Sequence, residues 1–384
     1  MRLFKSSCSL KGPAGPQFRQ ILTVVAVGLL GLPPASSTAQ STADIAAFVG
    51  RNGTVRLQPS RATVLGEGLV TLDDVRSAVV LADKSIVVAS KAVAAVIKYD
   101  RSGRQLQTFG RWGEGPFEYV APSIVRTYGN GVVVFDSGTL KFVRYRADGS
   151  GVEEWKGMTH SLSDFYMDSD DIVGFTGSAF DYFLLRIDRA AQDTSRFAEG
   201  SMLRSAVMSY EGTGNFGVRS GRAYYSYPDE SAVRIVDTVT GSETVVRIPD
   251  PEWKVVSGIL PADDFDDLNH ALFDGRLLKY LSGSSMNLGV KVLDDYTVAM
   301  IEDGHMSLDG SPVPEGKERV LKLFVFDRQM KLLDVVILNG ADRDRVGSVP
   351  VGTDGNALLF VNAEERGGGT DIEWKFRKLE IKGG

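Results

Sequence analysis

Cysteine is nearly absent from this sequence of 384 residues, in which Cys8 is the only one. The chain can therefore form no internal disulfide, and its fold has to rely on a hydrophobic core. Histidine is also rare. His160, His270 and His305 lie far apart and match no H-x-x-x-H or H-E-x-x-H spacing, so the sequence predicts no zinc site.

A long apolar run is missing as well. The most apolar stretch is residues 21–32, which is too short to span a bilayer comfortably, since a spanning helix needs about 20 apolar residues. A basic segment precedes it, and Ser37-Thr38-Ala39 follows with small side chains. The pattern predicts a signal peptide over residues 1–39, with an uncleaved N-terminal anchor as the alternative. Cleavage would leave residues 40–384, exported to the periplasm or the extracellular space.

Basic charge is not in excess. The first 39 residues hold four basic residues and no acid, so the rest of the chain has 39 Lys and Arg against 49 Asp and Glu, a formal net charge of −10. A protein that binds nucleic acid needs a positive surface to meet the phosphates. We therefore expect no nucleic-acid partner.

Two segments in the first half of the chain look like copies of each other. Each has a short β-branched run, a connector, a second strand and a polar turn that ends in glycine. Three matched pairs are each 46 residues apart: Val87 and Val133, Tyr99 and Tyr145, and Gly103 and Gly149. Strands and turns that recur at a fixed spacing predict a modular β architecture.

Fainter copies continue to the C-terminus, within residues 172–188, 223–248, 297–338 and 357–381. A period of about 45–50 residues with several strands in each is typical of β-propeller blades. A four-stranded blade has two apolar faces, and stacking blades in a ring buries both. We therefore predict an all-β chain with one domain, a six-bladed β-propeller with four strands in each blade.

The N-terminal residues 54–57 are left over by this repeat, and we expect them to form a strand that completes the last blade. Such a closure ties one end of the chain to the other, which matters more in a protein without disulfides. An open β-sandwich, two smaller β domains and a seven-bladed ring remain as alternatives.

One stretch, residues 261–275, does not fit the strand pattern. Phe265, Leu268 and Leu272 are spaced at i, i+3 and i+7, acids crowd the first turn and Gly275 follows. We predict a short amphipathic helix inserted before the fifth blade. It would act either as a loop helix packed on a blade or as a lid over the central channel.

The stretch from residue 109 to residue 149 carries a more specific signal. Its distinctive parts are Phe109-Gly110, the run Gly113-Glu114-Gly115-Pro116, Phe117-Glu118-Tyr119, the valines 132–134 and Asp148-Gly149. On these residues the chain resembles exported bacterial six-bladed β-propellers and, more distantly, NHL-repeat propellers. The resemblance covers residues 83–149 and implies the fold. It does not imply one activity, because such families include binding modules, interaction domains, lyases and lactonases.

The connector at residues 109–119 has two interpretations. Its glycines permit tight turns and its aromatic side chains suit the space between adjacent blades, which makes it a structural staple. In the functional interpretation, Arg111 and Trp112 project at the mouth of the ring and contact a ligand. The candidate ligand-binding residues are Arg111, Trp112, Glu114, Glu118 and Tyr119.

Catalytic and metal-binding motifs are scarce. No G-x-S-x-G sequence occurs, and the acidic clusters at residues 168–171 and 263–267 lack the calcium-loop pattern. The lactonase-like relatives that the resemblance implies use an acidic and amide metal site in the channel, and no stretch here matches it. The sequence identifies no catalytic residue, and we predict no metal and no cofactor; Ca²⁺ or another divalent ion stays open as an alternative that no motif supports.

These observations favour a non-catalytic, monomeric binding or interaction module whose partner is a protein, a peptide or a carbohydrate. The alternative is a metal-assisted hydrolase or lyase, similar to the lactonases, with its site in the central channel. Carboxylates from different blades could converge there, because each inner strand faces the axis.

Overall fold

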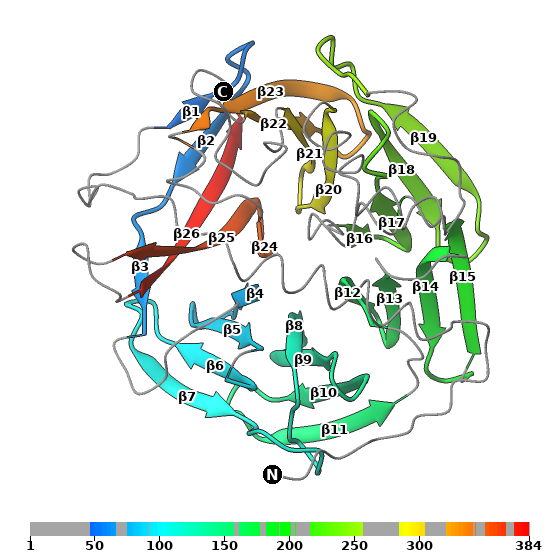
Figure 1. Cartoon of the computed structure of the whole chain (residues 1–384). Helices are drawn as coiled ribbons and strands as arrows, with labels where there is room; N and C mark the ends of the chain where they lie inside the picture. Colours follow the sequence, from blue (N-terminus) through cyan, green and yellow to red (C-terminus); the bar gives the residue numbers. More distant parts are fainter. Residues whose placement is uncertain are drawn as a thin grey trace, which may run out of the picture.

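Six antiparallel sheets stand around a central axis (Figure 1). They are seen in a computed structural model. It describes residues 47–66, 75–91, 93–156, 161–176, 182–191, 193–200, 204, 216–255, 284–303, 320–340, 342, 350–365 and 372–383. The predicted six-bladed β-propeller is confirmed. The predicted signal peptide and the predicted helix at residues 261–275 lie outside the described residues.

The first five blades each take four consecutive strands, from the inner edge to the outer edge (Figure 1). Blade one contains β4 (Val75–Val80), β5 (Ile86–Ser90), β6 (Ala95–Tyr99) and β7 (Gln105–Phe109). Blade two contains β8 (Pro122–Tyr128), β9 (Gly131–Asp136), β10 (Lys141–Tyr145) and β11 (Gly151–Lys156). Blade three contains β12 (Asp164–Asp168), β13 (Asp171–Phe175), β14 (Tyr182–Asp188) and β15 (Asp193–Glu199). Blade four contains β16 (Gly217–Arg219), β17 (Arg222–Tyr225), β18 (Ala232–Asp237) and β19 (Glu243–Arg247). Blade five contains β20 (Met286–Val292), β21 (Thr297–Asp303), β22 (Val320–Phe326) and β23 (Leu332–Leu338).

The sixth blade joins the two ends of the chain. Its inner strands are β24 (Gly352–Asp354), β25 (Ala357–Glu365) and β26 (Ile372–Gly383). The outer edge of β26 pairs with β2 (Val55–Pro59) and β3 (Thr63–Leu65), and β1 (Phe48–Val49) lies beyond β2. The N-terminal closing strand predicted from the sequence is therefore confirmed.

The closing strand is also fastened to blade five through Asp334 on β23. This buried carboxylate accepts hydrogen bonds from the backbone N–H groups of Asn52 (2.9 Å), Thr54 (2.8 Å) and Val55 (3.1 Å). One acidic side chain thus satisfies three donors at the point where the N-terminal segment turns into the ring.

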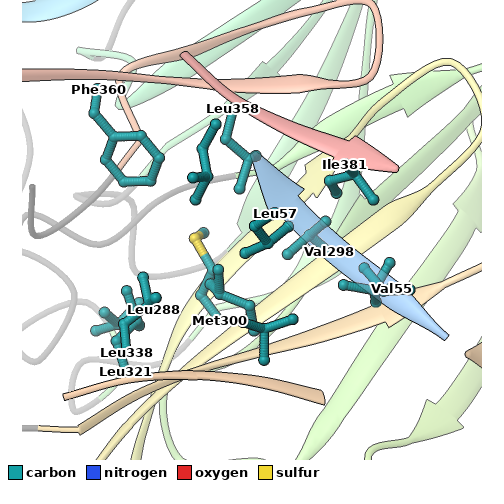
Figure 2. Packing of buried hydrophobic residues seen from close by; sticks show 14 of the residues in the cluster. Val55, Leu57, Leu288, Val298, Met300, Leu321, Leu338, Leu358, Phe360 and Ile381 are labelled. Carbon is teal, nitrogen blue, oxygen red and sulfur yellow. The ribbon is translucent and has the colours of Figure 1, made fainter. Parts of the chain in front are cut away.

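Each blade interface has its own hydrophobic cluster, and there are six such clusters for six interfaces. Figure 2 shows the one between blades five and six, where Leu57 and Ile381 pack beside Val298 and Met300. Middle strands such as β5 and β9 are buried on both faces, because a blade has a neighbour on either side. A closed ring gives every blade a neighbour on both sides, so the middle strands are buried on both faces, which explains how a chain without disulfides holds together.

Aspartates shape the turns between the third and fourth strands of four blades. The carboxylates of Asp100, Asp148, Asp237 and Asp327 each accept a hydrogen bond from the backbone N–H two residues further on. This arrangement is an Asx-turn, which replaces a backbone contact by a side-chain one. The repeat visible in the sequence is therefore the repeat of the blade.

Candidate functional site

The connector of residues 110–121 runs from the outer strand of blade one, β7, to the inner strand of blade two, β8. It is held against the outer half of blade two. The Lys141 ammonium on β10 donates to the Gly115 carbonyl (3.0 Å), and the Tyr145 hydroxyl donates to the Phe117 carbonyl (3.0 Å). Glu154 on β11 accepts from the Phe117 N–H and pairs with Lys141. The connector is therefore pinned to β10 and β11.

Internal hydrogen bonds stiffen the connector further. Glu118 accepts from the Gly115 N–H (2.8 Å) and from Arg111 Nε (2.8 Å), and these two contacts hold the pKa of its carboxyl below the usual value. Two glycines are required by close approach. At Gly110 (φ 67°) a Cβ atom would lie 2.5 Å from the Tyr119 ring, and at Gly113 it would meet the Glu118 carboxylate.

The five candidate residues from the sequence fall into two groups. Arg111, Trp112 and Glu114 face solvent, and Trp112 is 74% exposed. Glu118 is half-buried and bonded within the connector, so it belongs with Tyr119 in the packed group. Tyr119 is buried with Phe109 and Tyr145 between blades one and two, so it is part of the interface. The structural-staple interpretation therefore describes Tyr119, which packs between the blades. Ligand contact by Arg111 and Trp112 stays a prediction.

A second candidate site lies at the axis, where side chains from the inner strands meet. Arg126 on β8 forms an ion pair with Asp164 on β12, and the Lys291 ammonium on β20 lies 3.3 Å from the other Asp164 oxygen. Arg126 Nη1 also donates to Ser77 Oγ on β4 (2.8 Å). We call Ser77, Arg126, Asp164, Tyr166 and Lys291 the axial cluster.

Contacts of the axial cluster join blades that are not neighbours. Asp164 belongs to blade three and Lys291 to blade five, with blade four between them. The Tyr166 hydroxyl of blade three and the Thr353 side chain of blade six, the blade opposite to it in the ring, also interact. Such links cross the axis.

Local packing explains how Lys291 reaches the axis. Val290 and Val292 on either side of it pack in the interface between blades four and five. Because successive side chains of a strand point to opposite faces, Lys291 points away from that interface. Its side chain is 1% exposed. Burial lowers its pKa to about 8, an effect that Asp164 opposes and Arg126 strengthens.

The depressed pKa of Lys291 predicts a rise of stability in alkaline solution. Below pH 8 the buried ammonium is charged in both states, and its burial cost is fully present. Between the folded value of about 8 and the unfolded value of 10.5, only the unfolded state keeps the proton, so the free energy of unfolding rises with pH. We expect a gain of roughly 3–4 kcal/mol, since the two values differ by about 2.5 units and one unit is about 1.4 kcal/mol.

Chemical denaturation of the wild type and of Lys291→Met across this pH range, in buffer without carboxylates, checks the expectation. The variant removes the titrating group. A wild-type curve that is parallel to the variant's curve would contradict the buried position of this ammonium.

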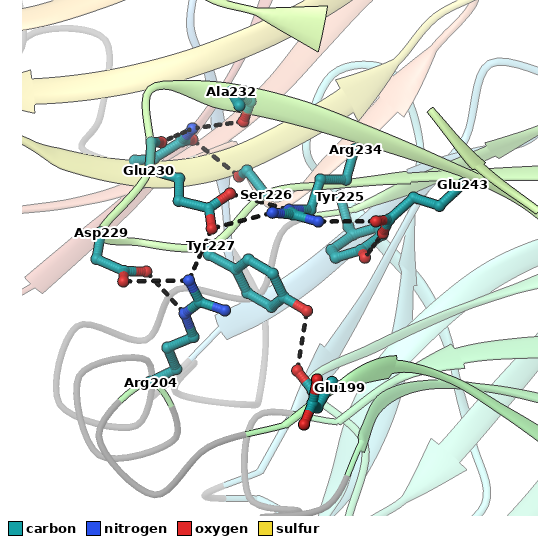
Figure 3. Close-up of polar contacts among 11 residues, drawn as sticks. Glu199, Arg204, Tyr225, Ser226, Tyr227, Asp229, Glu230, Ala232, Arg234 and Glu243 are labelled. Atoms are coloured by element: carbon teal, nitrogen blue, oxygen red, sulfur yellow. Dashed lines mark hydrogen bonds and ion pairs between the residues drawn. The ribbon is translucent and has the colours of Figure 1, made fainter. Parts of the chain in front are cut away.

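A third charged cluster lies at the end of blade four (Figure 3). Tyr227 lies between the Arg204 guanidinium (3.7 Å from the ring centroid) and the Arg234 guanidinium (4.9 Å). Arg204 pairs with Asp229 and Glu230, and Arg234 pairs with Glu230 and Glu243. The Tyr227 hydroxyl donates to the Glu199 carbonyl of blade three. Both arginines of this cluster have carboxylate partners, so their charges are balanced. The cluster therefore serves as a link between blades three and four through the Tyr227 hydroxyl.

Comparisons with known proteins agree with this architecture. A solved structure of a candidate exported protein from Bacteroides fragilis NCTC 9343 matches with a TM-score of 0.58 at 13% identity, over 87% of this chain and 97% of that one. A member of the DUF4221 family from Bacteroides vulgatus ATCC 8482 matches with a TM-score of 0.55 at 9% identity, over 86% and 99%. The chain shares the propeller fold of these two proteins.

Other comparisons say less about this propeller. Virginiamycin B lyase from Staphylococcus aureus has a TM-score of 0.41 at 13% identity, over 89% of the propeller chain and 96% of its own. No family model and no curated protein matches the sequence. In the described part of the propeller, no helix is long and apolar enough to cross a membrane.

Sequence reasoning missed the axial cluster of the propeller. Its members come from four different blades, and no local motif joins them. One signal was present: Arg126 follows Ile124-Val125, and Lys291 stands between two valines, so each is a lone charge in an apolar first strand. In a propeller the first strand of each blade lines the axis, and a lone charge there points to an axial site.

Proposed function

We propose that the chain is an exported, non-catalytic module that binds a protein or peptide partner through the connector of residues 110–121. The observation that carries the proposal is Trp112, a large aromatic side chain that is 74% exposed on a segment pinned to blade two. Rigid aromatic and arginine side chains are over-represented among residues that dominate binding energy. Because the connector is already ordered, it loses little conformational entropy when it binds.

The charged side chains of the connector indicate which chemical groups a partner would carry. The Arg111 side chain is 82% exposed while its Nε atom is held by Glu118, so the guanidinium is positioned and still open to a partner. Glu114 is exposed beside it. A partner with an apolar group for Trp112 and a carboxylate for Arg111 fits this surface. A carbohydrate stacked on Trp112 is the other ligand class that the test includes.

Replacing Trp112 by alanine is expected to weaken binding at least about 30-fold, because loss of a central aromatic contact costs 2 kcal/mol or more. Peptide and glycan arrays probed with the full chain would identify a ligand, and titration would give its affinity for each variant. The exposed side chain of Trp112 makes no core contact, so the melting temperature should not change.

Val239→Ala is the matched control, because Val239 is 71% exposed in the turn between β18 and β19, away from the connector. It should bind as the wild type does. Equal affinity of Trp112→Ala and wild type would contradict the proposal, as would the absence of saturable binding on both arrays.

A second candidate function is a hydrolase or lyase with its site in the central channel. One observation favours it: the Lys291 ammonium has a pKa of about 8 and lies beside the Asp164 carboxylate, as suits proton transfer near neutral pH. Saturable turnover of an ester, lactone or peptidyl substrate that is lost in Lys291→Met would support it. Among the described residues no group of three or more His, Cys, Asp and Glu is placed to hold a metal ion.

A further inference from the structure

The axial cluster has more hydrogen-bond donors than acceptors. Arg126 Nη1 donates to Ser77 Oγ and to the Val125 carbonyl, and Nη2 donates to Asp164. Arg126 Nε is buried and has no partner in the described part of the chain. An ammonium carries three donors, and Asp164 is the one hydrogen-bond acceptor that the described residues offer to Lys291.

The axial cluster also has more positive than negative charge. Arg126 and Lys291 are two cations, and within the described ranges Asp164 is the one carboxylate that faces both. Tyr166, the other titratable group in contact, is neutral, because burial raises its pKa. Three of these side chains are more than nine-tenths buried: Arg126, Asp164 and Lys291. Among the described residues, one buried positive charge is therefore left without a counterion, which is costly at low dielectric.

Lys322 on β22, in the same blade as Lys291, is a buried lysine whose charge is balanced by carboxylates. Its ammonium is also 1% exposed, and it contacts three carboxylates, those of Asp250, Glu252 and Asp303. Burial lowers its pKa, but the three hydrogen bonds outweigh burial and the net pKa is raised. These two lysines, both 1% exposed, thus differ in the direction of their pKa shift: Lys322 has three carboxylate partners, and Lys291 has one in the described part of the chain.

We propose that the axial cluster binds one carboxylate group, which accepts hydrogen bonds from Arg126 Nε and Lys291 Nζ and supplies the missing negative charge. A carboxylate carries one charge, which matches the excess, and it has two oxygens for two donors. Phosphate carries about two negative charges near neutral pH and would reverse the imbalance. Chloride offers no pair of directed acceptors. This site is separate from the connector, so it stands or fails independently of the proposed function.

The test uses acetate as the probe and the full chain as the protein. Thermal midpoints are measured in increasing sodium acetate at constant ionic strength, with sodium chloride and sodium phosphate as parallel series. For the wild type at about pH 7 we expect a saturable rise of the midpoint with acetate, because a ligand of the folded state stabilises it by mass action. At about pH 9.5, where Lys291 has lost its proton, the rise should largely vanish.

Lys291→Met keeps the length of the side chain and removes the excess charge, so it is expected to fold. It should show no response to acetate, whereas Lys156→Met, at an exposed position on β11, should respond as the wild type does. Line broadening of ¹³C-labelled acetate by the protein gives a second readout that does not depend on unfolding. Equal responses of wild type and Lys291→Met, or chloride as effective as acetate, would overturn the proposal. A wild type without any saturable response would also overturn it.

Discussion

Asp164→Asn is expected to lower the free energy of unfolding by about 3–5 kcal/mol, because it removes the shared partner of two buried cations. Asp164 is 3% exposed and pairs with Arg126 and Lys291 at once. An asparagine keeps the volume and one acceptor oxygen but carries no charge. The two cations would then repel each other in a site that water hardly reaches. Chemical denaturation of wild type and variant at neutral pH measures the loss.

The double variant Asp164→Asn with Lys291→Met separates charge from shape. It leaves a single unpaired cation at the axis, so we expect it to recover part of the stability that Asp164→Asn loses. Asp148→Asn, in an exposed turn of blade two, is the matched control and should change stability little. If Asp164→Asn lowered the free energy of unfolding no more than Asp148→Asn does, the claim that the axial ion pairs stabilise the folded propeller would be contradicted.

Asp334→Asn is expected to weaken the closure of the ring by about 3–4 kcal/mol, because buried N–H groups would lose a charged acceptor. One carboxylate oxygen accepts from Asn52 and Val335, and the other from Thr54 and Val55. An asparagine can satisfy one of these pairs, while its NH₂ group faces the N–H donors of the other. Loss of stability should appear together with faster hydrogen exchange in β2.

The pH dependence of Asp334 gives an independent check. Burial alone would raise its pKa, but the four backbone N–H groups outweigh burial and hold the pKa below the usual value. A depressed folded-state pKa means that the contribution is complete above about pH 4 and is lost as pH falls through the folded value. Wild type and Asp334→Asn should therefore converge in acid. Asp327→Asn is the matched control: its carboxylate accepts from the Gln329 and Lys331 N–H groups of its own turn between β22 and β23, so hydrogen exchange in β2 should stay as in the wild type.

Much of the fold could be predicted because a propeller repeats its own constraints. Each blade needs middle strands that are apolar on both faces, as in Val132-Val133-Val134, and turns that tolerate tight bends, as at Gly103 and Gly149. These local needs recur at the length of one blade. The closing strand could be predicted for the same reason, since residues 54–57 were one strand more than the repeat required.

The axial cluster could not be predicted because it is set by ring geometry. Asp164 and Lys291 are 127 residues apart, and what brings them together is the number of blades between them. The structure of the connector at residues 110–121 could be predicted in part. Its glycines and aromatic residues indicated a packed turn, but only the positions of Lys141 and Glu154 on the next blade show what it is pinned to.

The pKa of Lys291 in the full chain is the most direct test of the axial cluster and of the carboxylate site proposed there. It can be read from the ¹³Cε chemical shift of a lysine-labelled protein, with Lys291→Met to assign the signal. We expect a pKa of about 8 in buffer without carboxylates, and a rise when acetate is added. A value near 10.5 that acetate does not change would contradict both the buried ammonium at the axis and the carboxylate site.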